Sequence, residues 1–248
     1  MVKKIVLMII VTIIFMSILG AIFLGLRPII IDLLEEFRKN GVLLDEKFDC
    51  TGVFVDKRDD NEYTIVQIGD QCWMGENLRY TENECLENEW NSIAPFNACK
   101  IHSTDWGKEV LYQWESAMDE RKEEGSQGLC PDGWHIPNDD EWTILERYLG
   151  LEKKEVNNIY SRGTDQGDQL KDDINWNGTN SSRFTALPTG LRDASGSHYF
   201  EDSYGSWWSS SHTDDFKAWR RYLYSEVSTI ERGVYSYAHG ISVRCVAN

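Results

Sequence analysis

Aromatic and basic residues gather late in the sequence, and their types suit the binding of a sugar. A sugar ring presents a flat C–H face that stacks on Trp or Tyr, while neighbouring polar groups bind its hydroxyls. The candidate ligand-binding residues are His198, Tyr204, Trp207, Trp208, Trp219 and Arg220, with Tyr199 in the same stretch. The alternative is that these aromatics pack in the core. Because successive side chains alternate across a strand, at most one of Trp207 and Trp208 is expected to face inward.

Catalytic chemistry finds little support in the sequence. There is no glycine-rich phosphate loop ending in Gly-Lys-Ser/Thr and no Gly-x-Ser-x-Gly nucleophile elbow. The run Ser209-Ser-Ser-His212 places serine beside histidine, but a catalytic triad is assembled in space rather than by adjacency. The five histidines lack metal-ligand spacing, and His135 is expected to be a hydrogen-bonded packing residue. We therefore expect no catalytic residue, no metal ligand and no enzymatic activity.

Carboxylate-rich segments raise the question of calcium, which prefers hard oxygen ligands. Such segments lie at 56–62, 138–141, 165–168 and 172–173, and none has the spacing of an EF-hand loop. Asn138 is also better placed as a helix cap. Solvated acidic loops and no cofactor are therefore expected, with calcium as the alternative.

Charge is distributed unevenly along the 248 residues, which carry 25 Lys and Arg against 41 Asp and Glu. Residues 1–40 hold 5 basic and 3 acidic residues, a net charge of +2. The remainder holds 20 basic and 38 acidic residues, a net charge of −18. Such acidity excludes nucleic acid as a partner, because phosphate binding requires a basic surface. A hydrophobic content of 41% excludes disorder as the main state.

The N-terminal segment has the pattern of a membrane anchor. Residues 5–26 contain no charge, and a helix of this length spans ~33 Å, which matches a hydrocarbon core of ~30 Å. Lys3 and Lys4 favour a cytoplasmic tip at 1–4. We expect a transmembrane signal anchor at 5–26, with a cleaved signal peptide as the alternative.

Residues 27–44 are expected to form a stalk helix and linker, beginning near Pro28 and ending near Gly41. A helix lying on the membrane or binding a partner is the alternative. Residues 45–248 would then be an exported domain, held outside the cytoplasm in the periplasm or at the cell surface. All six cysteines follow the anchor, and an even number on the exported side indicates a disulfide framework.

Several blocks from about residue 50 onward resemble, in order, the Fibrobacter succinogenes major paralogous domain family. The blocks are residues 63–78, 112–118, 130–142, 184–190, 207–210 and 242–246, and they include Gly133-Trp-His-Ile-Pro137 and Ser242-Val-Arg-Cys-Val246. The resemblance implies an exported bacterial domain of unassigned activity with a C-type-lectin-like fold, shared with the formylglycine-generating enzymes. Position and this resemblance favour the disulfides Cys50–Cys72, Cys85–Cys99 and Cys130–Cys245. With all six cysteines structural, the cysteine-based oxidase activity of those enzymes is not expected here.

Local patterns agree with an α+β domain of short antiparallel strands, two or three short helices and long loops. Asn138 followed by Glu141 is a capping box, which predicts a helix from there to Gly150. Further short helices are expected at 110–118 and 155–160. Strands are expected at 52–55, 63–68, 184–187, 219–225 and 241–246, with 56–62 connecting the first two as a hairpin. Trp73, Trp114, Trp134 and Trp142 lie inside the blocks and are expected to be buried.

These observations favour a non-enzymatic, membrane-anchored envelope protein whose domain binds or adheres to a polysaccharide or a protein. A structural subunit of an envelope assembly is the second hypothesis. A formylglycine-generating type of enzyme is the third.

Overall fold

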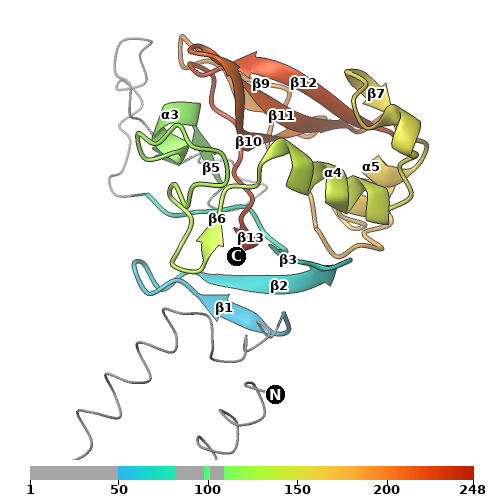
Figure 1. Ribbon diagram of the computed structural model, residues 1–248, viewed down its shortest axis with the longest axis horizontal. Helices are drawn as coiled ribbons and strands as arrows, with labels where there is room; N and C mark the ends of the chain where they lie inside the picture. Colours follow the sequence, from blue (N-terminus) through green and yellow to red (C-terminus); the bar gives the residue numbers. More distant parts are fainter. Residues whose placement is uncertain (1–49, 82–97, 101–108) are drawn as a thin grey trace, which may run out of the picture. The chain divides into compact units, whose positions relative to one another are not determined.

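The computed structural model describes residues 50–81, 98–100 and 109–248, and Cys50–Asn248 forms one compact unit. The unit is mostly β-structure with few and short helices (Figure 1). The expected α+β class with short antiparallel strands is therefore confirmed at this level. The expected anchor at 5–26, the stalk at 27–44 and the disulfide Cys85–Cys99 lie outside the described residues. Within those residues, no helix is long and apolar enough to cross a membrane.

The first sheet contains strands from both ends of the unit. Its order is β1-β2-β3-β13-β6, and every pairing is antiparallel. The strands are β1 (Val53–Val55), β2 (Glu62–Ile68), β3 (Gln71–Met74), β13 (Val246–Ala247) and β6 (Trp134–His135). The predicted β1–β2 hairpin is confirmed, and its turn is closed by a bond from the Asp56 amide to the Asn61 carbonyl.

Two disulfides fasten this sheet. Cys50–Cys72 joins the segment before β1 to β3, and Cys130–Cys245 joins the segment before β6 to the residue directly before β13. Both pairings match those expected.

The second sheet carries the longest strands and has the order β10-β11-β12-β7, again antiparallel throughout. Its strands are β10 (Tyr204–Asp214), β11 (Lys217–Tyr224), β12 (Ile230–Ser236) and β7 (Tyr160–Arg162). Two small ribbons complete the strands: β4 (Ala98–Lys100) with β5 (Val110–Tyr112), and β8 (Leu191–Arg192) with β9 (His198–Tyr199).

The main helix, α4 (Asp139–Tyr148), begins at the predicted capping box and lies against β10 and β11 (Figure 1). The Asn138 side chain accepts from the Glu141 amide at 2.8 Å, and Glu141 accepts from the Asn138 amide at 2.9 Å. The other helices are α3 (Trp114–Ala117), α5 (Gln166–Leu170) and the 3-10 turn η1 (Lys153–Glu155).

Some predicted elements are wrong. The helix expected at 155–160 is replaced by η1 and β7, because Tyr160 pairs with Arg232 of β12. Of the strand expected at 184–187, only an isolated bridge from Ala186 to Lys171 forms. The segment expected as a strand at 241–246 forms isolated bridges at Ile241 and Ser242 before β13. The first part of the helix expected at 110–118 is β5.

Two hydrophobic clusters lie on opposite sides of β10. Trp207 packs in one cluster with Trp73, Trp142 and Phe184, and Trp208 packs in the other with Trp114 and Trp134. The four tryptophans expected to be buried are buried. Because both faces of β10 are covered, Trp207 and Trp208 both face the interior, and the expectation that at most one would do so is wrong.

Candidate ligand-binding face

The second sheet carries a different group of polar side chains on each of its two faces. The groups are separate because successive side chains along β11 point to opposite faces of the sheet. Arg220, Tyr222 and Tyr224 point to one face, and Trp219 and Arg221 point to the other. Strand pairing extends this division, since Tyr204 lies opposite Tyr224 and Arg220 lies opposite Gly233. We call the side that carries Arg220 the tyrosine face; its tyrosines are Tyr204, Tyr222, Tyr224 and Tyr235.

Arg220 lies among the rings of the tyrosine face. Its guanidinium carbon is 3.7 Å from the ring centre of Tyr235, 4.4 Å from that of Tyr222 and 5.8 Å from that of Tyr204. Nη1 donates to the Tyr204 hydroxyl and, at 3.4 Å, to Ser206 Oγ. The guanidinium group of Arg220 is thus surrounded by aromatic faces and hydroxyls, and these contacts hold it in one position.

The buried hydroxyls beside Arg220 remain neutral at ordinary pH. Burial raises the pKa of Tyr204 well above its usual value, although the charge of Arg220 opposes this effect. Burial likewise raises the pKa of Tyr222 to about 12. The tyrosines therefore act as ring faces and neutral hydroxyls toward Arg220, and they do not neutralise its charge.

A continuous line of rings leads from the tyrosine face to the surface. Tyr199, Phe200, Tyr204, Tyr224 and Tyr222 form this aromatic strip, and successive ring centres along it are 5.2–6.2 Å apart. Three of its members are exposed, Phe200 to 61%, Tyr199 to 45% and Tyr224 to 43%, whereas Tyr204 and Tyr222 are buried. Tyr199 and Phe200 are exposed rings in contact with each other, and such a pair offers a stacking surface that an isolated surface aromatic does not.

Phe200 holds a backbone conformation that bulky residues avoid, with φ at +62°. It follows β9, and its carbonyl accepts bonds from the Ser203 amide and hydroxyl at 3.3 and 3.2 Å. Nearby, a Cβ on Gly190 would lie 2.5 Å from the Tyr199 carbonyl oxygen, so the turn packs closely there. The turn therefore holds a backbone conformation that costs free energy for a phenylalanine while its ring stays exposed to solvent.

Two histidines border the tyrosine face. The ring of His239 is 4.1 Å from that of Tyr235, and burial together with the charge of Arg220 lowers the pKa of His239. His198, which pairs with Arg192 in the β8–β9 ribbon, contacts Glu201 at 2.5 Å. Burial lowers the pKa of His198 despite Glu201. At neutral pH both imidazoles are therefore mainly uncharged.

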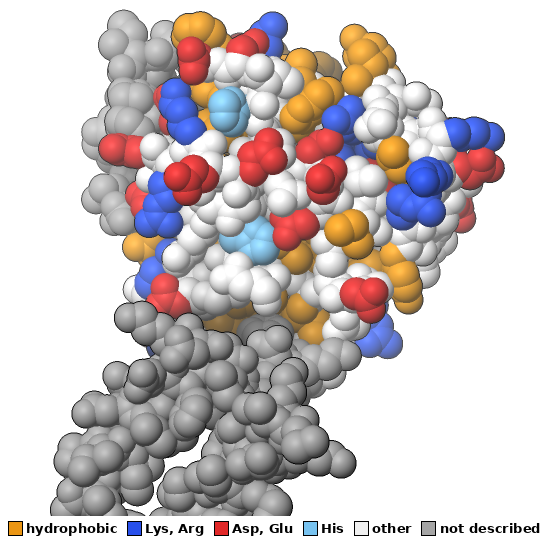
Figure 2. Space-filling view, viewed as in Figure 1, with side chains coloured by type: hydrophobic (Ala, Val, Ile, Leu, Met, Phe, Trp, Pro, Cys, Tyr) orange, Lys and Arg blue, Asp and Glu red, His pale blue; other side chains and the backbone are white. Residues whose placement is uncertain are grey.

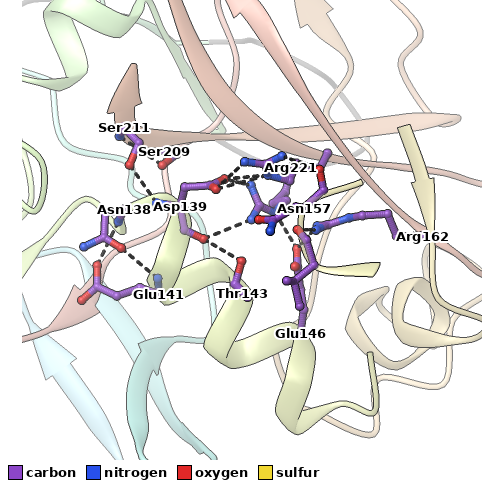
Figure 3. A network of polar contacts seen from close by, with 12 residues as sticks. Asn138, Asp139, Glu141, Thr143, Glu146, Asn157, Arg162, Ser209, Ser211 and Arg221 are labelled. Carbon is purple, nitrogen blue, oxygen red and sulfur yellow. Dashed lines mark hydrogen bonds and ion pairs between the residues drawn. The ribbon is translucent and has the colours of Figure 1, made fainter. Parts of the chain in front are cut away.

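The opposite side of the second sheet holds a buried ion-pair network that fastens α4 (Figure 3). Asp139 accepts from Arg221 and Arg232 at 2.6 Å each, and Glu146 accepts from Arg162 at 2.6 Å and from Arg221 at 2.5 Å. Burial raises the pKa of Asp139, but the bonds and charges of the two arginines outweigh burial and leave this pKa below its ordinary value. The network joins the helix to three strands and so has a structural role.

Trp219 belongs to this network and not to the tyrosine face. The guanidinium carbon of Arg232 lies 3.6 Å from the Trp219 ring centre, so a cation already covers one face of the ring. The sequence placed Trp219 beside Arg220 as a binding residue, but the alternation of β11 separates the two.

Of the remaining predicted binding residues, some are buried and others are partly exposed. Trp207 and Trp208 are core residues, and the indole nitrogen of Trp207 donates to Asn77 Oδ1 at 2.7 Å. Tyr204 is also buried, although its ring forms the inner part of the aromatic strip. The structure therefore corrects the expectation that these three rings lie at the surface. Arg220 and His198 are partly exposed and lie on or beside the tyrosine face.

Phe200, Tyr222, Tyr224 and Tyr235 are the strip and face residues that sequence reasoning missed. Phe200 and Tyr224 neighbour the predicted residues in the sequence. Tyr235 is brought close only by the pairing of β11 with β12, which places it beside Arg220.

Another buried arginine, Arg244, holds the end of the chain to the first sheet. Arg244 donates to Asn77 Oδ1 at 2.7 Å and to the carbonyls of Met74 and Phe184. Asn77 in turn donates to the buried Glu109 at 2.8 Å. Burial raises the pKa of Glu109, and the bond from Asn77 and the charge of Arg244 only partly oppose this. These residues are enclosed by protein and serve the fold.

His135 is buried and bonded at both nitrogens, to Glu141 Oε1 at 2.8 Å and to Asn248 Oδ1 at 2.6 Å. Burial lowers the pKa of His135, but these bonds and the charge of Glu141 outweigh burial and leave it raised. The expectation of a hydrogen-bonded packing residue is confirmed.

The acidic segments considered for calcium have partners within the protein. Asp56 pairs with Arg58, Asp168 pairs with Lys171, and Asp172 accepts from the amides of Ile174 and Asn175. Among residues 50–81, 98–100 and 109–248, no three His, Cys, Asp or Glu side chains gather in a way that could hold a metal ion. Figure 2 shows acidic, basic and separate hydrophobic side chains interspersed on the side of the molecule in view.

The sequence model of the Fibrobacter succinogenes major domain matches residues 66–247, more than two thirds of the chain. The chain belongs to this family. The Fibrobacter succinogenes major domain here begins within β2 and ends in β13, so it includes the whole second sheet and the tyrosine face. No curated protein and no solved structure matches the chain.

Proposed function

We propose that this protein is a non-enzymatic carbohydrate-binding module of the cell envelope, and that the aromatic strip is its binding surface. The observation that carries this proposal is an aromatic strip with three exposed rings, whose buried members, Tyr204 and Tyr222, contact the partly exposed Arg220. Phe200 and Tyr224 offer ring faces to the C–H face of a sugar, and Arg220 and Ser206 offer donors and an acceptor for its oxygens.

We propose further that the domain has a C-type-lectin-like fold, as the family resemblance implies. Short strands in two sheets, few helices and a disulfide between residues 130 and 245 support this comparison. Two disulfides support an oxidising location outside the cytoplasm. The uncharged segment at 5–26 supports a membrane anchor that displays the domain there.

A polysaccharide pull-down with residues 45–248 tests the proposal. We expect retention on at least one polysaccharide or cell-wall fraction, and a repeat with a chelator shows whether calcium is required. Phe200→Ala should weaken retention about tenfold, since a stacked ring contributes roughly 0.5–1.5 kcal/mol beyond the free energy of its buried area.

Phe216→Ala is the matched control. Phe216 is 73% exposed in the turn between β10 and β11, outside the aromatic strip, so its removal should leave retention unchanged. Equal loss in both variants, or no retention on any polysaccharide, would contradict the proposal. Capture of an envelope protein through Phe200, without sugar binding, would instead support the structural-subunit hypothesis.

A further inference from the structure

Arg220 differs from the other arginines of the second sheet. Arg162, Arg221 and Arg232 pair with Glu146 or Asp139 across the opposite face. Elsewhere in the unit, Arg58 and Arg79 also have carboxylate partners, whereas the buried Arg244 is held by Asn77 and backbone carbonyls. Within the described part of the chain, Arg220 forms no ion pair with a carboxylate. The lack of a carboxylate partner for Arg220 is unexpected, because residues 41–248 hold 38 acidic groups against 20 basic ones.

Aromatic contacts compensate for the missing carboxylate only in part. A cation over an aromatic face gains less free energy than a desolvated guanidinium gains from a well-placed carboxylate. Nη1 is engaged by Tyr204 and Ser206, whereas Nη2 makes no hydrogen bond to the described residues. The guanidinium therefore retains a donor and most of its charge.

Acidic groups occur around the tyrosine face, but among the described residues none of them forms an ion pair with Arg220. Asp193 accepts bonds from Ser195 and Ser197 within its own turn. Glu231 lies opposite Tyr222 in the pairing of β11 with β12 and accepts from Thr229. The positions opposite Arg220 are Gly233 on β12, where a Cβ would lie 3.4 Å from the Tyr222 ring, and Trp208 on β10. Neither neighbouring strand therefore places a carboxylate directly opposite Arg220.

We propose that Arg220 binds the anionic group of an acidic sugar, a carboxylate or a sulfate ester, while the aromatic strip stacks on the sugar ring. A planar guanidinium matches the paired oxygens of either group. The overall charge of the domain does not prevent this, because charges farther away than about 8 Å are largely screened at physiological salt. This inference rests on the proposed function and names its ligand class.

Calorimetric titration of the purified full-length protein tests the inference with pairs of ligands that differ only in charge. The first pair is trigalacturonate and its methyl ester, and the second is a sulfated galactose oligomer and its desulfated form. We expect the charged member of at least one pair to bind about 10- to 100-fold more tightly, the range of a hydrogen bond between charged groups. The pair that shows the preference distinguishes a carboxylate from a sulfate.

Arg220→Gln should abolish this preference, so that both members of a pair bind equally, and an unchanged thermal unfolding transition reports that the variant is folded. Arg220→Lys should keep part of the preference, because the charge remains but the planar donor pair is lost. Equal affinity for both members of both pairs in the unaltered protein would overturn the inference and leave the proposed function intact. A preference that survives Arg220→Gln would also overturn it. Absence of binding to all four ligands would count against both proposals.

Discussion

At Phe200, the binding role proposed for the ring can be tested separately from its contribution to stability. Its ring is largely exposed and its backbone is left-handed, so the ring stabilises the fold little while the backbone costs about 1 kcal/mol relative to glycine. We expect Phe200→Gly to unfold in denaturant at the same or a higher concentration than the unaltered protein. Phe184→Ala, which removes a buried ring, should instead cost about 3–5 kcal/mol. A loss of more than about 2 kcal/mol in Phe200→Gly would show that its ring belongs to the core.

Asp139 gives a second prediction at the scale of one residue. Its pKa lies below the ordinary 3.8 in the folded state, so its contribution is present above about pH 4 and is lost as pH falls through the folded value. Asp139→Asn should cost about 3 kcal/mol at neutral pH, because Arg221 and Arg232 would then lack a charged partner. The variant should also lose less stability than the unaltered protein on acidification below pH 4. Denaturant unfolding across this range measures both effects, and the exposed neighbour Asp140→Asn is the control.

At the scale of elements, α4 shows what a local pattern can predict. Asn138 and Glu141 are three residues apart, and their reciprocal bonds form as expected. By contrast, the sequence patterns did not predict strands β10 and β12. The run from Tyr204 to Ser211 lacks alternation because both of its faces are buried, and Glu231 and Arg232 give β12 the composition of a surface loop. The ion pairs join residues up to 93 positions apart, so no local pattern could reveal them.

The helix cap can be tested against a cap that makes no side-chain bond. Asn138→Ala should destabilise the domain by about 1 kcal/mol, since the Glu141 amide loses its acceptor. Asp165 occupies the same position before α5 without a side-chain capping bond, so Asp165→Ala should cost no more than a few tenths of a kcal/mol. Thermal unfolding compares the two, and equal effects would show that the capping bond in α4 contributes nothing.

For the whole molecule, the two disulfides should contribute unequally. They close spans of 115 and 22 residues, and loop-closure entropy assigns about 5 kcal/mol to Cys130–Cys245 and about 3 kcal/mol to Cys50–Cys72. Replacing each pair by serines and measuring unfolding in urea tests this order. Greater loss from the Cys50–Cys72 pair would show that local constraints dominate over loop length.

The place of β13 has a consequence for how the domain folds. This strand is close to the end of the sequence, yet it lies inside the first sheet between β3 and β6. The hairpin of β1 and β2 can form locally and early, but the sheet stays divided until a segment more than 170 positions away along the chain arrives. A chain crossing a membrane from its N-terminal end would therefore expose the edge of β3 throughout transit, and assembly of the domain would be among the last events of its export.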